Sequence, residues 1–131
     1  MIFVDTSAWF ASVVPSDADH RAASLWVSQN TQALLTTDYV IDETLTLLRT
    51  RREAQRAISL GEAFFSNELS TIYYLTEEDV WQTWQTFQQV ADKNWSFTDC
   101  ASKVVMEKLE LIQAFSFDRH FRQFGSISVV P

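Results

Sequence analysis

The feature that most limits the fold is the alternation of short apolar runs with segments of helical periodicity along the chain. The runs are rich in β-branched and aromatic residues, which is typical of buried strands. They are Ile2–Val4, Ala33–Thr37, Ile72–Leu75, Gln113–Phe117 and Ile127–Val130. Strands that alternate with helices pair in parallel and need cover on both faces. The sequence therefore predicts a three-layer α/β/α fold around a central parallel sheet of about five strands.

The segments between these runs carry helix signals of their own. Thr76 and Asp79 form a capping-box pattern that opens a helix reaching about Val90, and Ser96 with Asp99 opens another that ends near Leu111. The other segments predicted as helical are 8–14, 22–26, 39–50 and 52–66. Because 131 residues suit one domain and no linker interrupts the pattern, we predict a single domain over residues 1–131.

Four acidic residues occupy positions from which their carboxylates can meet. Asp5 and Asp118 end the first and fourth predicted strands, and Asp99 lies in the first turn of a helix. Glu43 lies one turn into the helix that follows the second strand. Ligands of open parallel sheets bind beyond the carboxyl ends of the strands, where the strand order switches. We therefore expect the four acids to converge at this edge.

Clustered carboxylates imply a bound cation, because they repel one another and would otherwise take up protons. Oxygen ligands without nearby cysteine or histidine favour Mg²⁺ or Mn²⁺ over zinc. A divalent ion lowers the pKa of bound water and stabilises charge on a phosphoryl group. The chemistry that this pattern indicates is phosphodiester hydrolysis.

Each acid also has a purely structural interpretation. Asp5 fits a helix N-cap, and Asp99 fits the third helical position of the box begun by Ser96, a role compatible with metal binding. Glu43 could be a solvated helix residue and Asp118 a turn residue. Convergence of all four, more than any single residue, supports a site.

The segments that carry these acids are FVDTSAW at 3–9, TTDYVIDETLTLL at 36–48, SFTDCAS at 96–102 and AFSFDRHF at 114–121. In this order and spacing they resemble the PIN-domain ribonucleases, in particular the VapC-type toxins of prokaryotic toxin–antitoxin pairs. The resemblance spans nearly the whole chain. It implies a magnesium-dependent endoribonuclease that leaves 3′-hydroxyl and 5′-phosphate ends, a cognate antitoxin and a homodimer.

The resemblance also implies roles for individual residues. The residues matching the family's acidic quartet are Asp5, Glu43, Asp99 and Asp118. Asp5 and Asp99 are expected to contribute most directly to Mg²⁺, with Mn²⁺ also accepted. Ser7 matches a small polar position that supports the water shell of the metal, and Thr98 matches the hydroxyl before the third acid. Helix capping is the alternative for both.

The net charge of −7 counts against a generic nucleic-acid-binding surface. Setting aside the four acids leaves −7 + 4 = −3, which is a mild charge. The arginines that could contact RNA phosphates are Arg49, Arg51, Arg52 and Arg56, after the helix with Glu43, and Arg119 and Arg122, beyond Asp118. A solvated surface is the alternative for all six.

Three further features carry expectations that a structure can test. His120 could be a general base, but metal-activated water makes one unnecessary, so we expect no catalytic role for it. The stripe of Val80, Trp84 and Phe87, with Trp81 beside it, is expected in the core, with an interface as the alternative. His20 is expected at the surface, and Cys100 is expected to be a buried thiol.

The remaining sequence features bear on the cellular location of the protein and on other protein classes to which it could belong. The amino terminus lacks a signal-peptide pattern, no run could cross a membrane, and one cysteine fits a reducing compartment, so a cytoplasmic location is expected. Only Gly61 and Gly125 are glycines, which excludes P-loop and dinucleotide-binding proteins. The competing function is a non-catalytic module that binds RNA or a protein partner.

Overall fold

The computed structural model describes residues 1–131 and contains one sheet of five parallel strands in the order β3-β2-β1-β4-β5. The strands are β1 (Ile2–Val4), β2 (Leu34–Thr37), β3 (Thr71–Tyr73), β4 (Gln113–Phe115) and β5 (Ser128–Val130). From the central β1 the chain builds outward first to β2 and β3, and later to β4 and β5. The strand order therefore switches beside β1, which puts Asp5 at the position where such sheets bind ligands.

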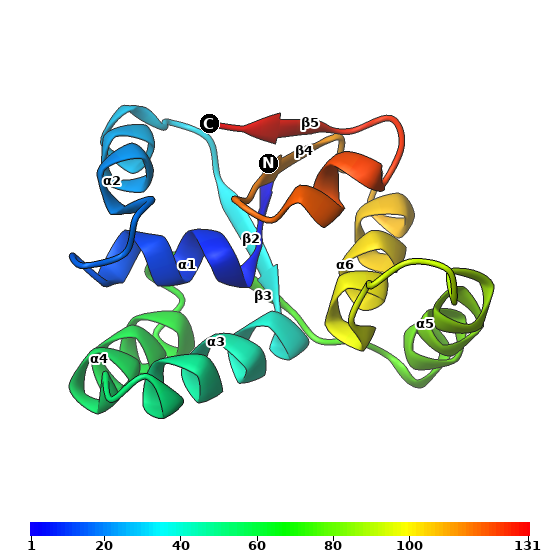
Figure 1. Ribbon diagram of the computed structural model, residues 1–131, viewed down its shortest axis with the longest axis horizontal. Coiled ribbons are helices and arrows are strands. Elements are labelled where there is room, and N and C mark those ends of the chain that lie inside the picture. Colours follow the sequence, from blue (N-terminus) through cyan, green and yellow to red (C-terminus); the bar gives the residue numbers. More distant parts are fainter.

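Six α-helices cover the sheet, which confirms the three-layer α/β/α fold. They are α1 (Thr6–Val13), α2 (His20–Gln29), α3 (Asp38–Thr50), α4 (Ala54–Phe65), α5 (Glu77–Gln89) and α6 (Phe97–Lys108), and a short 3₁₀ helix, η1 (Arg119–Gln123), follows β4. Figure 1 places α1, α2 and α4 on one side of the sheet and α5, α6 and η1 on the other. Helix α3 packs against both α1 and α6, so it joins the two sides. No helix is both long and apolar enough to cross a bilayer.

Two predicted helix boundaries are corrected by backbone conformation. The helix expected over 52–66 begins at Ala54, because Arg52 has a φ of 62°, which lies outside the helical range. The helix expected to end near Leu111 ends at Lys108, since Glu110 has a φ of 55°. The fourth strand is also shorter than expected and pairs only over Gln113–Phe115, so Ser116 and Asp118 lie in the loop beyond it.

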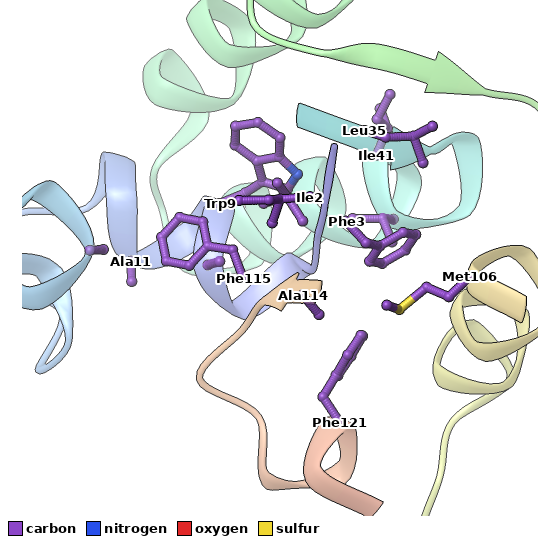
Figure 2. Packing of buried hydrophobic residues seen from close by; sticks show 14 of the residues in the cluster. Ile2, Phe3, Trp9, Ala11, Leu35, Ile41, Met106, Ala114, Phe115 and Phe121 are labelled. Carbon is purple, nitrogen blue, oxygen red and sulfur yellow. The ribbon is translucent and has the colours of Figure 1, made fainter. Parts of the chain in front are cut away.

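The core packs aromatic rings against both faces of β1. Figure 2 shows Phe3, Met106 and Phe121 gathered on one side of this strand, and Trp9 and Phe115 on the other. The rings of Phe3 and Phe121 stack with centroids 6.1 Å apart, and Trp9 meets Phe64 edge-on at 4.9 Å. Because the residues of β1 are at most 1% exposed, the strand that precedes Asp5 is held rigidly from both sides.

The aromatic stripe of α5 is not part of this core, so the expectation for it was wrong. Trp81, Trp84 and Phe87 are 61, 43 and 38% exposed, and the fully buried residues of α5 are Asp79 and Thr83. Helical periodicity predicts that one face is apolar but does not say what covers it. His20 also differs from expectation, because it is half-buried with its ring Nδ1 2.7 Å from the carbonyl oxygen of Ala11.

A buried carboxylate fastens α5 to the rest of the molecule. Asp79 accepts hydrogen bonds from the Tyr73 hydroxyl at 2.6 Å, the Thr76 backbone N–H at 3.0 Å and the Lys108 ammonium at 2.9 Å. Burial alone would raise the pKa of Asp79, but these hydrogen bonds lower it to about 2. One side chain thus links β3, the start of α5 and the end of α6.

We predict that Asp79→Asn lowers the free energy of unfolding by about 2 kcal/mol at neutral pH, because it removes charge-assisted hydrogen bonds at a buried position. A lowered pKa stabilises the fold above the unfolded-state value, so the difference from wild type should shrink as the pH falls from about 4 towards 2. Urea unfolding across this pH range measures it. Glu77→Gln, an exposed change in the same helical turn, should cost less than about 1 kcal/mol; an equal loss in both variants would contradict the prediction.

Candidate active site at the carboxyl edge of the sheet

Asp5 is held in one orientation at the centre of the site. It follows β1 and caps α1, and it is only 3% exposed. Its Oδ2 accepts hydrogen bonds from the Ser7 hydroxyl at 2.8 Å and the Ser116 hydroxyl at 3.1 Å. The capping interpretation of Asp5 is therefore correct, but two further hydroxyl groups converge on the same carboxylate, and a cap does not need them.

Ser7 and Ser116 connect Asp5 to the loop after β4. Their hydroxyl oxygens lie 3.2 Å apart. The Ser7 Oγ accepts a hydrogen bond from the backbone N–H of Phe117 at 2.9 Å, and the Ser116 Oγ accepts one from Asp118 at 3.0 Å. Ser7 was expected in the site, whereas Ser116 was missed. No local signal marked it, because the predicted strand extended to Phe117 and placed Ser116 inside it, whereas β4 ends at Phe115.

Asp99 combines a structural contact with a site contact. It forms a full capping box with Ser96, because its Oδ2 accepts the Ser96 N–H at 3.0 Å and its own N–H donates to the Ser96 hydroxyl at 3.0 Å. The same Oδ2 lies 3.1 Å from Nδ1 of His120. The capping interpretation of Asp99 is therefore confirmed, and its contact with His120 leaves the metal-binding interpretation open as a prediction.

Asp118 and His120 complete a compact group with Asp99. Asp118 caps η1 by accepting the His120 backbone N–H at 2.9 Å, and its Oδ1 lies 3.4 Å from the His120 Nδ1. One ligand atom from each of these three residues lies within 4.8 Å of the others. Sequence reasoning assigned His120 no role and did not place it here. The only local signal was its position two residues after a strand-end aspartate.

Glu43 approaches the same group from α3. Burial raises the pKa of its carboxyl, and the charges of Asp99 and Asp118 raise it further, while the Thr6 and Thr98 hydroxyls oppose the shift. Thr6 in turn accepts a hydrogen bond from Thr44 at 3.3 Å within the buried interface between α1 and α3. Asp5 and Glu43 are not part of the group that Asp99, Asp118 and His120 form within 4.8 Å. Both carboxyls nevertheless lie close enough to Asp99 for its charge to raise their pKa.

The electrostatics of the site favour a bound cation. Burial raises the pKa of Asp5 to about 6, the charge of Asp99 adds to this, and the Ser7 and Ser116 hydrogen bonds oppose it. No lysine or arginine forms an ion pair with any of the four acids, and the basic side chain within 4.0 Å of them is the imidazole of His120. A divalent cation would relieve both raised pKa values. The premise that no histidine lies near the acids was wrong, because His120 Nδ1 is 3.1 Å from Asp99. Two carboxylates with one imidazole nitrogen suit a divalent cation but do not by themselves select Mg²⁺ over a transition metal.

Only two of the six predicted RNA-contacting arginines lie beside the acids. Arg119 and Arg122 belong to η1, which starts at the residue after Asp118. Arg49, Arg51, Arg52 and Arg56 lie at the far end of α3 and on the turn into α4. Since a helix rises about 1.5 Å per residue, Arg51 lies about 12 Å along α3 from Glu43. Arg56 also pairs with Glu53 at 2.9 Å.

Cys100, the residue after Asp99, takes no part in the site. Its side chain is fully buried, as expected for a packed thiol, and burial raises its pKa to about 11, with a further contribution from the charge of Asp99. The thiol therefore stays protonated at neutral pH and is not a nucleophile.

Comparison with known proteins agrees with this geometry. Residues 2–127 match the model of the PIN domain family. The chain is 34% identical over 132 residues to the "23S rRNA-specific endonuclease VapC20" of Mycobacterium tuberculosis, with 100% of this chain and 99% of that protein covered. A "VapC ribonuclease" of Archaeoglobus fulgidus is 29% identical over 123 residues, which cover 90% of this chain and 77% of that protein.

Solved structures lead to the same family. The crystal structure of M. tuberculosis VapC20, described as a "Sarcin-Ricin loop cleaving toxin", superposes with a TM-score of 0.92 at 29% identity and covers 100% of both chains. FitAcB from Neisseria gonorrhoeae matches at a TM-score of 0.69 and 14% identity, covering 100% of this chain and 97% of that one, and shows likeness of fold alone. PIN domains are nucleases that generally depend on divalent metal, and an acidic cluster of this kind is present here. The family match, the full-length relatives and the shared fold show that the chain belongs to the PIN-domain family, as an endoribonuclease of the VapC type.

Proposed function

We propose that this protein hydrolyses RNA phosphodiesters with Mg²⁺, or alternatively Mn²⁺, held by its four converging carboxylates. These are Asp5, Glu43, Asp99 and Asp118. The observation that carries the proposal is that Asp99 and Asp118 offer ligand atoms within 4.8 Å of each other, and no lysine or arginine pairs with them. The charge of Asp99 also raises the pKa of the Asp5 and Glu43 carboxyls, so both lie near this group. Such an arrangement is costly unless a cation balances it.

Different residues of the site would have different roles in the reaction. A divalent cation bound there supplies two things, a lowered pKa for a bound water and charge neutralisation on the phosphoryl group. Ser7 and Ser116 fix the Asp5 carboxylate by hydrogen bonds of 2.8 and 3.1 Å. The Nδ1 atom of His120 lies 3.1 Å from Asp99 and 3.4 Å from Asp118, so its ring can orient both carboxylates. Thr98 and Ser7 present hydroxyl groups that can orient water near the acids, and the cut would leave a 3′-hydroxyl and a 5′-phosphate.

Ribosomal RNA is the first substrate class that we propose, because a relative identical at 34% of positions over the full chain is described as 23S rRNA-specific. Arg119 and Arg122 stand beside the acids and would contact phosphates near the cut. Only an RNA that continues along α3 would reach the other four arginines, which are Arg49, Arg51, Arg52 and Arg56.

The protein is further proposed to act in the cytoplasm as the toxin of a toxin–antitoxin pair, with an antitoxin that blocks the acids until it is removed. The toxin description of VapC20 supports this role. We also propose a homodimer that buries the aromatic stripe of α5, which is Trp81, Trp84 and Phe87. Large aromatic side chains are enriched at protein interfaces, and this stripe is exposed in the single chain.

We predict that Asp5→Asn and Asp99→Asn each reduce RNA cleavage more than about 100-fold, because losing a direct metal ligand removes several kcal/mol of transition-state stabilisation. The assay is cleavage of total RNA by purified, partner-free protein with Mg²⁺, Mn²⁺ or EDTA. Asp42→Asn is the matched control, since Asp42 is an exposed acid beside Glu43. If wild-type protein binds RNA yet never cuts it with either metal, the non-catalytic alternative is favoured instead.

A second prediction concerns the stability of the metal-free protein. Because the pKa of Asp5 is raised from 3.8 to about 6, the folded state holds its proton more tightly than the unfolded state does. This residue's contribution to the free energy of unfolding should therefore fall as the pH rises from about 4 to 6. Asp5→Asn removes the penalty, so in EDTA the variant should exceed wild type by up to about 3 kcal/mol at pH 7 and by little at pH 4.

Urea unfolding of both proteins at several pH values measures this difference, and pairing them cancels the other titrating groups. Adding Mg²⁺ should stabilise wild type and leave the variant almost unchanged. A wild-type advantage in EDTA at pH 7 would mean that the Asp5 carboxylate does not carry the electrostatic penalty that we infer.

The dimer proposal predicts that Trp84→Gln with Phe87→Gln weakens self-association at least about tenfold, because buried aromatic residues dominate interface energies. Light scattering over a concentration series measures the dimer constant. Leu25→Gln is the control, since Leu25 is 58% exposed on α2, on the other side of the molecule (Figure 1). Wild-type protein that stays monomeric at high concentration would rule the dimer out.

A further inference from the structure

A small polar pocket adjoins the acid cluster, and four of its lining residues have no role in the site described so far. Its volume is about 350 Å³, within the range of pockets that hold small ligands. It lies between η1 and the loop that joins α5 to α6, and no hydrophobic residue lines it. Its lining residues are Asp92, Lys93, Asn94, Arg119, His120 and Gln123. Because His120 also contacts Asp99 and Asp118, one side chain separates the pocket from the acids.

The pocket is positively charged in an otherwise acidic protein. Lys93 and Arg119 form no ion pair, whereas Arg56, Lys103 and Lys108 are each paired with a carboxylate. Asp92 is the only acid in the lining, so the charge of the pocket is 2 − 1 = +1 with His120 neutral. Two other pockets also carry a net charge of +1, so what distinguishes this one is its position beside Asp99 and Asp118. Two unpaired cations beside a phosphodiester-cleaving site suit a phosphate group.

The pocket also offers neutral hydrogen-bonding groups on a fixed support. The Gln123 Oε1 accepts a hydrogen bond from the indole N–H of Trp95 at 2.8 Å, which leaves its amide N–H groups without a protein partner. Trp95 is 5% exposed and packs on Phe124 with ring centroids 4.9 Å apart. Asn94 offers a second amide with no hydrogen-bond partner in the protein. Side-chain amides are the groups that bind base edges by paired donors and acceptors.

We propose that this pocket binds the nucleotide adjacent to the cleaved bond of the RNA. Lys93 and Arg119 contact its phosphate, and Asn94 and Gln123 face its base. A strand whose scissile phosphate lies at the acids must continue across the neighbouring surface, and this pocket provides both charge and polar contacts there. The proposal rests on the ribonuclease function proposed above and assigns to Lys93 and Asn94 a part in choosing where the RNA is cut.

The test compares Lys93→Gln and Arg119→Gln with the matched control Arg21→Gln, which removes one positive charge from α2 on the far side of the molecule (Figure 1). The substrate is a short RNA that wild type cuts. At physiological salt each lost phosphate contact should raise KM about fourfold and lower the salt slope of log(kcat/KM) by about 0.7, with kcat almost unchanged. Lys93→Arg should restore both values, and Arg21→Gln should change neither.

A second arm tests base contact through Asn94→Ala. Wild type and variant are given RNAs that differ only in the nucleotide on either side of the cut, and the variant should lose at least part of the wild-type preference. Unchanged KM, salt slope and base preference in all pocket variants would overturn the proposal, and would leave the pocket to a protein partner.

If the proposed ribonuclease function is wrong, the wild-type protein will cut no RNA, and this outcome is distinct from failure of the pocket proposal. In that case the same variants are compared by fluorescence anisotropy with a labelled single-stranded RNA in EDTA, where no cleavage is needed. Binding about fourfold weaker for Lys93→Gln than for Arg21→Gln supports the pocket, and equal binding overturns it.

Discussion

The structure of the site depends on the hydrogen bonds that join the ends of β1 and β4. Ser7 and Ser116 both donate to Asp5, and each accepts a backbone N–H from the loop after β4. These contacts set the path of the chain from Ser116 to Asp118, and therefore the position from which η1 starts. The buried carboxylate of Asp5 would be unfavourable without these hydrogen bonds. Through them it fixes the loop that positions Asp118 and His120.

Burial of the Asp5 carboxylate also explains why this nuclease site lowers the stability of the fold. Parallel strands bring their carboxyl ends to one edge, and the two central strands are buried too deeply for water to screen charge there. The chain compensates elsewhere, with aromatic packing around Phe3 and Trp9 and with the Asp79 network at the other end of α6. The electrostatic cost of the buried carboxylates at this edge is tolerated because stable packing surrounds it.

The sequence allowed the sheet and the meeting of the acids to be predicted, because strand alternation fixes which ends of the strands share an edge. It did not reveal Ser116 or His120, since their roles come from contacts with Asp5 and Asp99 across long stretches of chain. Periodicity identified the apolar face of α5 but could not show that the chain covers it only in part, with Phe87 against Phe97 of α6 and Trp81 61% exposed. The distance of Arg49 and its neighbours from the acids likewise depends on the direction in which α3 runs.

The site is assembled from residues that are far apart in the chain, and this has a consequence for synthesis of the protein. Asp5 and the end of β1 emerge from the ribosome early, but Ser116, Asp118 and His120 belong to the loop and 3₁₀ helix that follow β4. Until β4 has inserted beside β1, Asp5 lacks one of its hydrogen-bond donors and the cluster lacks two of its members. A growing chain therefore lacks a complete acid cluster until almost all of the domain has been translated.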